Sequence, residues 1–135
     1  IEVMRRQAED IAKADTTKPE AKQALKELDA KMKAVELLML SNSDLMSDDK
    51  YYVETYKIYL QLLWLGGYVG TGASDVAGGA DARPTDSAIE HLGDIEKDLK
   101  TAKVKFDELM SKVIADFNKQ WAGKLKAITA AKVAM

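Results

Sequence analysis

One segment, residues 85–121, constrains the fold of this chain more than any other. It directly follows a proline and contains no proline itself. Its apolar residues recur in steps of three and four, which is the spacing of one stripe along an amphipathic helix. The stripe consists of Ile89, Leu92, Ile95, Leu99, Ala102, Phe106, Leu109, Val113, Phe117 and Trp121. Charged residues occupy the opposite side, so the rest of the chain must cover the stripe, and an all-α fold is predicted.

Two shorter segments repeat this spacing and predict further helices. Residues 1–14 place apolar side chains on one face, but no N-cap signal precedes them, so we expect the second half of a truncated helix. Residues 19–40 begin with a proline, which suits the first turn of a helix, and carry a second apolar stripe. Because residues 37–40 are apolar on every side, we expect this end of the second helix to be deeply buried.

A third shorter helix is predicted at residues 47–65, where a serine and two aspartates provide an N-cap and acids for the first turn. Gly66-Gly67 is its expected end, or else one further turn to Gly70. Together with the long C-terminal helix, these segments predict an antiparallel up-down bundle of four helices, the first of them truncated. We expect residues 1–135 to form a single domain, as a piece of a longer protein.

The charge pattern excludes two classes of partner. Twenty basic and 22 acidic residues are interspersed and leave a net charge of −2. The chain therefore has no basic footprint for nucleic acid and no polybasic membrane patch. The longest apolar run, residues 58–69, is interrupted by Gln61 and two glycines and is too short for a membrane span. Cysteine is absent, which excludes disulfides and thiolate metal sites.

Two features suggest ligand sites but lack the rest of the required pattern. The glycine-rich stretch 67–72 follows a predicted helix rather than a strand and has no lysine after it, unlike a phosphate-binding loop. His91 is the single histidine, whereas a di-iron bundle needs Glu-x-x-His pairs on two helices. We therefore expect no catalytic residue, no cofactor site and no metal site in this chain.

The third predicted helix is rich in aromatic residues, which calls for contacts over a wide arc of its surface. These residues are Tyr51, Tyr52, Tyr56, Tyr59 and Trp64. One interpretation is a face that binds a sugar or a peptide. The simpler interpretation is that two or three of them belong to the core and the rest line an interface.

The two ends of the long helix carry separate predictions. At its start, Pro84 fixes the approach of the chain, and the Thr85 hydroxyl is expected to cap the helix. At about 1.5 Å per residue the helix would span about 55 Å, against about 30 Å for the second and third helices. Its far end near Phe117 and Trp121 therefore lacks a neighbour unless the first helix or a second copy covers it. We expect exposed apolar surface or a dimer contact there, and fraying beyond Gly123.

Five short motifs in this order resemble the C-terminal helical region of large bacterial sortilin-like or BNR-repeat glycosyl hydrolases. The motifs are Met4-Arg5-Arg6-Gln7, Ala34-Val35-Glu36, Leu62-Leu63-Trp64-Leu65-Gly66, Ala80-Asp81-Ala82-Arg83-Pro84-Thr85 and Asp116-Phe117-Asn118. The aromatic third helix and the glycines Gly70, Gly72, Gly78 and Gly79 depart from the usual pattern. They leave room for a distinct local role.

The resemblance implies a non-catalytic accessory domain of a larger secreted or periplasmic β-propeller protein. In that family any glycosidase chemistry would lie in the propeller, so no catalytic residue carries over to this chain. The implied partners are upstream domains of the same polypeptide, against which the helices would pack, or a second copy of the chain. The alternative hypothesis is a module that binds a glycan or a peptide through the tyrosine-rich helix and the glycine-rich loop.

Overall fold

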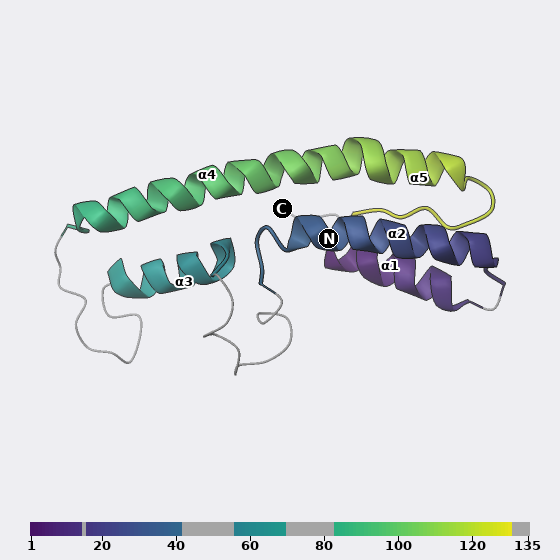
Figure 1. Ribbon diagram of the computed structural model, residues 1–135, viewed down its shortest axis with the longest axis horizontal. Coiled ribbons are helices and arrows are strands. Elements are labelled where there is room, and N and C mark those ends of the chain that lie inside the picture. The colour runs from purple at the N-terminus through teal and green to yellow at the C-terminus, as the bar shows by residue number, and fades with distance from the viewer. Residues whose placement is uncertain (15, 42–55, 70–82, 131–135) are drawn as a thin grey trace. The chain divides into compact units, whose positions relative to one another are not determined.

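The computed structural model describes residues 1–14, 16–41, 56–69 and 83–130, and this part of the chain contains helices and no strands (Figure 1). The helices are α1 (Glu2–Lys13), α2 (Pro19–Glu36), α3 (Ile58–Val69), α4 (Asp86–Glu108), the π-helical η3 (Leu109–Ile114) and α5 (Ala115–Gln120). The last three follow one another without interruption and make one helix of 35 residues. The predicted all-α bundle with a long C-terminal helix is confirmed.

The chain divides into two compact units. Unit 1 combines residues 1–36 with the segment that begins at Val104, and unit 2 consists of residues 37–103. Each unit buries its own cluster of apolar side chains. The long helix contributes residues to both clusters, as its apolar stripe requires.

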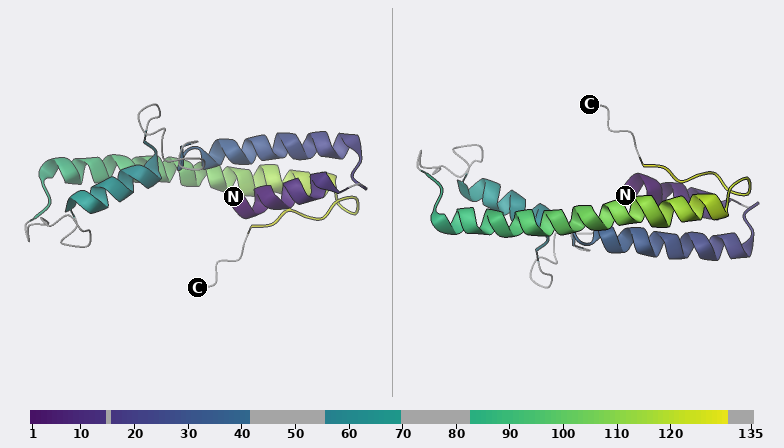
Figure 2. Two further views of the ribbon diagram at one scale, coloured as in Figure 1. Left: turned by 90° about the horizontal axis from the view of Figure 1, so that it is seen from below. Right: turned by 90° about the horizontal axis from the view of Figure 1, so that it is seen from above.

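Unit 1 is built on α1 and α2, which lie side by side and antiparallel (Figures 1 and 2). In the turn between them the Thr17 hydroxyl donates a hydrogen bond of 2.6 Å to the carbonyl oxygen of Ile11. Arg5 of α1 joins the two helices through ion pairs with Asp29, at 2.7 Å, and Glu36, at 2.6 Å. The core of unit 1 contains Met4, Ala8, Leu25, Leu28, Met32, Leu109, Ile114, Phe117 and Ile128.

The π-helical segment η3 changes which residues of the long helix face the core of unit 1. A regular helix would turn residue 117 about 80° away from residue 109, because eight residues exceed two turns. A π-helical turn accommodates the additional residue, and Leu109 and Phe117 are both buried. For the same reason Ile114 is buried, whereas Val113, which the predicted stripe included, is only half-buried.

α5 ends at Gln120, just before Gly123, beyond which the last helix was expected to fray, and the segment that follows folds back along unit 1. Gly123 has φ +74°, a left-handed conformation that suits glycine, and it lies in the reversal. The Asn118 side chain then pairs with the backbone of Ile128: its amide donates to the carbonyl at 2.8 Å and accepts from the N–H at 2.9 Å. The N–H of Thr129 donates to Gln7 of α1 at 3.0 Å, and the returning segment runs beside α1 (Figure 2).

This covering removes one of the two expectations for the far end of the long helix, exposed apolar surface at Phe117, whereas the expected dimer contact stays a prediction. Phe117 is only 8% exposed and belongs to the core of unit 1, and Trp121 packs against that core. The length estimate compared the long helix with the second and third helices alone. In the structure α1 and the returning segment also contribute to this core, so the expected exposed apolar surface near Phe117 is wrong.

Unit 2 has a smaller cluster of buried apolar side chains than unit 1 has. Ile58 of α3 packs with Ile95 and Ala102 of α4, and Leu65 lies against this cluster. The N–H of Tyr59, in the first turn of α3, donates to the carbonyl of Met39 at 3.1 Å. Thr85 caps α4 as predicted, because its hydroxyl accepts from the Ala88 N–H at 3.2 Å.

The boundaries of α2 and α3 differ from the prediction. α2 ends at Glu36, and the residues after it are not deeply buried, since Met39 is 41% exposed. α3 begins at Ile58 and continues through Gly66-Gly67 to Val69, close to the alternative end at Gly70. The predicted N-cap near residue 47 lies outside the described residues.

We expect Thr85→Ala to lower the free energy of unfolding of unit 2 by about 1 kcal/mol, because the Ala88 N–H loses its capping acceptor. Thr85→Ser keeps a hydroxyl and serves as the matched control. Urea unfolding followed by circular dichroism measures both variants. An alanine variant as stable as the serine variant would contradict the capping role.

We expect Asn118→Ala to cost about 1–3 kcal/mol, because both backbone groups of Ile128 lose their partner. The amide of Ile128 should then exchange with solvent faster, which hydrogen exchange followed by NMR detects. Gln120→Ala changes an exposed amide side chain nearby and should leave this exchange unchanged. Equal exchange rates at Ile128 in all three proteins would show that Asn118 does not hold the returning segment.

Candidate functional site

α3 stands out because none of its twelve residues is charged. Apart from the tyrosine hydroxyls and the Trp64 indole N–H, the polar group of α3 is the Gln61 side chain, which donates to the carbonyl of Tyr56 at 2.7 Å. A helix that is apolar all round is typical of a position buried on all sides. Its twelve residues are too few to cross a membrane, and no helix in the described part of the chain is long and apolar enough to do so.

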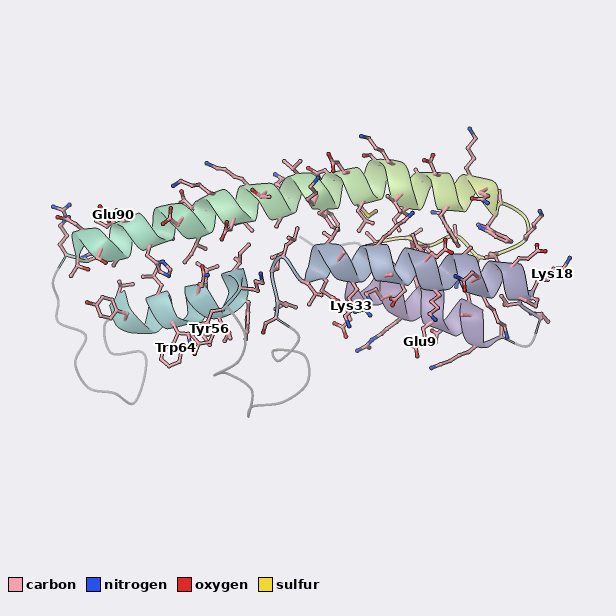
Figure 3. The ribbon with its side chains drawn as sticks, viewed as in Figure 1. Glu9, Lys18, Lys33, Tyr56, Trp64 and Glu90 are labelled. Carbon is pink, nitrogen blue, oxygen red and sulfur yellow. The ribbon has the colours of Figure 1, made fainter. Side chains whose placement is uncertain are left out.

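Most of α3 is nevertheless exposed. Ile58 and Leu60 are buried, whereas Trp64 is 64% and Tyr68 is 70% exposed. We define the α3 face as the exposed apolar side chains of this helix: Tyr59, Leu62, Leu63, Trp64, Tyr68 and Val69. Figure 3 shows Trp64, together with Tyr56 just before the helix, on the side of α3 turned away from α4. Exposed apolar side chains gathered in this way are typical of an interaction site.

The part of α4 in unit 2 adds to the exposed apolar surface. The buried residues of this part are Ala88, Ile95 and Ala102, which lie seven residues apart. Three members of the predicted stripe, Ile89, Leu92 and Leu99, are exposed instead. The prediction that the whole stripe is covered is therefore wrong for unit 2. Because two of the three buried residues are alanines, α4 buries only a small apolar area within unit 2.

A shallow hollow of about 340 Å³ opens where the end of α3 meets the start of α4. Trp64 and Tyr68 supply aromatic surface to it, and Ser87 and His91 supply polar groups. The complete lining is Trp64, Leu65, Tyr68, Thr85, Ser87, Ala88 and His91. The hydroxyl of Thr85 already accepts from the Ala88 N–H, which leaves its O–H donor and one acceptor lone pair.

Two adjacent glycines interrupt the side chains of the α3 face. A Cβ atom added to Gly66 or to Gly67 would meet no described atom within 4 Å, so no packing within the described part of the chain requires glycine at either position. Glycine inside a helix costs about 1 kcal/mol relative to alanine. The bare backbone at this point would let another surface approach α3 closely.

The predicted site residues fall in separate places. Tyr59 and Trp64 lie on the α3 face, and Tyr56 precedes it. None of these three is buried, and the prediction that two or three of the five aromatic residues are core stays a prediction, because it now depends on the other two. Tyr51 and Tyr52 lie outside the described residues, as does the glycine-rich segment 70–82.

Phe117 is buried in the core of unit 1, whereas Trp121 is half-buried and packs against that core. Pro84 and Thr85 lie where α4 begins, as predicted. Sequence reasoning missed Leu62, Leu63 and Tyr68 as members of the exposed face. The complete lack of charge across residues 58–69 was the signal that could have identified them.

Among the described residues, the shifted pKa values belong to ion pairs on helices. The hydrogen bond with Asp29 raises the pKa of Arg5 above its ordinary value, and Glu36 adds to this effect. The hydrogen bond from Lys97 lowers the pKa of Asp94, which is fully exposed. Within the described ranges, no group of three or more histidine, aspartate or glutamate side chains is placed to hold a metal ion.

Comparison with protein-family models, curated proteins and solved structures finds no match to this chain.

The two tryptophans should differ strongly in their access to solvent. In a Trp121→Phe variant only Trp64 fluoresces, and we expect long-wavelength emission with efficient quenching by acrylamide, because Trp64 is exposed. In a Trp64→Phe variant only Trp121 fluoresces, and quenching should be weaker, because its ring packs on Phe117 with centroids 6.3 Å apart. Equal quenching constants would mean that Trp64 is covered.

Proposed function

We propose that this chain is a non-catalytic accessory helical domain that packs against another folded domain through the α3 face. The observation that carries this proposal is the exposure of an uncharged helix whose side chains include Trp64 and Tyr68. Exposing the apolar side chains of such a helix to water is unfavourable in free energy, and covering them with a second apolar surface removes this cost.

The residue types on the α3 face favour a protein partner. Tryptophan and tyrosine are enriched among the residues that dominate the binding energy of protein interfaces. Covering one large apolar side chain contributes about 1.5–3 kcal/mol, so a few such residues suffice for stable packing within one polypeptide. A partner with an apolar surface and no net charge fits best, because α3 has no charge to offer.

The partner we propose is an upstream domain of the same polypeptide. This step depends on the sequence resemblance to sortilin-like and BNR-repeat glycosyl hydrolase-type proteins, in which the helical region follows β-propeller repeats. Under this proposal any glycosidase activity belongs to the propeller, and the longer protein is secreted or periplasmic. A second copy of this chain is the competing occupant, and the experiment below separates the two.

The test compares the isolated chain with the longer polypeptide that includes its upstream domains. We expect the helical part to unfold at a higher temperature in the longer polypeptide, and Leu63→Lys to cancel this gain by placing a charge on the α3 face. Val104→Lys is the matched control, because Val104 is also an exposed apolar residue but lies in unit 1. Calorimetry and limited proteolysis measure both variants.

Three outcomes decide the proposal. Loss of the thermal gain in Leu63→Lys but not in Val104→Lys supports packing of upstream domains on the α3 face. The absence of any gain in the unmodified longer polypeptide would overturn it. A concentration-dependent dimer of the isolated chain that Leu63→Lys dissociates would assign the face to a second copy instead.

The hollow beside Trp64 favours a second candidate, a module that binds a glycan. Aromatic rings next to hydroxyl and imidazole groups provide stacking surface and hydrogen bonds in one place. Glycan arrays and calorimetry on the isolated chain test this candidate. Trp64→Ala and Tyr68→Ala should abolish glycan binding, whereas Leu63→Lys should not, since Leu63 does not line the hollow.

A further inference from the structure

In unit 2, α4 carries exposed apolar side chains directly beside its buried ones. Ala88 and Ile95 are buried, and Leu92 and Leu99 follow them by four residues each and are 41% and 43% exposed. A step of four residues exceeds one helical turn by about 40°. Leu92 and Leu99 therefore flank the buried face of α4, and both do so on the same side of it.

α3 repeats this arrangement. Ile58 and Leu65 belong to the cluster that packs with α4, and Leu62 and Val69 follow them by four residues each and are exposed. The two helices are antiparallel, because the end of α3 lies against the start of α4 (Figure 1). In two antiparallel helices, equal rotation away from their contact leads to the same side of the pair. We call the exposed side chains that share this side the α3–α4 side: Leu62, Val69, Leu92 and Leu99.

The edges of the α3–α4 side differ in charge. Residues one position after the inward-facing ones lie about 100° around each helix and form these edges. On α3 they are Tyr59 and Gly66, which are uncharged, and on α4 they are Ile89, Glu96 and Lys103. No ion pair among the described residues joins Glu96 or Lys103, so both charges are open to a partner.

We infer that the neighbouring domain covers the α3–α4 side with an amphipathic helix, a step that rests on the proposed function. This helix lies along α3 and α4 as the third member of a bundle, with its apolar stripe on the α3–α4 side. Residues of opposite charge on one of its edges pair with Glu96 and Lys103. From Ile89 to Lys103 α4 advances about 21 Å, which matches a helix of about 14 residues.

Two observations favour a separate helix over other occupants. Leu92 and Leu99 are seven residues apart, as are Glu96 and Lys103, and seven residues is the repeat at which two packed helices meet. The α3 of a second copy has no charge to pair with Glu96 or Lys103. A helix from another domain can supply both the apolar stripe and the two opposite charges.

The first experiment replaces Leu92 or Leu99 by the photo-crosslinking residue p-benzoylphenylalanine in the longer polypeptide, and mass spectrometry locates the cross-linked sites. The two positions are about 10.5 Å apart along α4. Over this distance a helix advances about seven residues and a strand about three. We expect both positions to cross-link to one upstream segment, at sites about seven residues apart. The same replacement at Val104, in unit 1, is the control and should not reach that segment.

The second experiment measures the thermal gain that the upstream domains provide. We expect Leu92→Lys and Leu99→Lys each to cancel this gain, whereas Val104→Lys should keep it. Each variant is also measured in the isolated chain, and the gain is the difference between the two melting temperatures.

Gly66 provides a test in which the two forms of the protein respond differently. In Gly66→Leu the isolated chain should unfold at no lower a temperature, because an added Cβ meets no described atom within 4 Å and leucine favours a helix over glycine. The longer polypeptide should lose its thermal gain, because the new side chain stands between α3 and the docked helix. Gly66→Ala is the matched control for helix propensity and should keep most of the gain.

The outcomes separate this inference from the proposed function. Cross-linked sites about three residues apart would identify a strand and overturn the helix alone. A gain that Leu63→Lys cancels but Leu92→Lys and Leu99→Lys leave intact would also overturn the inference and keep the proposed function. Cross-links to a second copy or within this chain, or no gain in the unmodified longer polypeptide, would overturn both.

Discussion

The apolar stripe of the long C-terminal helix has to be covered, and most other features of this protein follow from that constraint. In unit 1 the covered residues include Leu109, Ile114 and Phe117, which are large and pack against α1 and α2. In unit 2 they are Ile95 and two alanines, which bury far less apolar surface. The two units therefore differ in how much of their apolar surface is removed from water.

α3 belongs to unit 2, the unit that buries less apolar surface, and none of its residues is charged. A helix without a charged residue would be an ordinary core element if neighbours surrounded it, but here only Ile58 and Leu60 are buried. The remaining aromatic and aliphatic side chains stay accessible, and the glycines at positions 66 and 67 leave bare backbone between them. The proposed packing on another domain would remove these exposed apolar side chains from water.

In unit 1, one side chain determines the course of the segment after α5. Asn118 offers a donor and an acceptor, and both pair with the backbone of Ile128 in the way that a neighbouring strand would. This pairing places Ile128 in the core. Before it, the chain reverses direction, and Lys124 and Lys126 lie near the turn between α1 and α2. The course of the returning segment thus depends on a contact between residues ten positions apart.

The sequence by itself determined the helices, the cap at Thr85 and the faces of α1 and α2, because periodicity and capping act over a few neighbouring residues. It also contained the uncharged character of α3. Only the tertiary structure decided which part of the long stripe is covered, since Ile89 and Phe117 occupy the same predicted stripe and differ in their neighbours. The π-helical shift at residues 109–114, the return of Ile128 to the core and the burial of the Trp121 donor likewise arise from packing between distant segments, which local patterns do not encode.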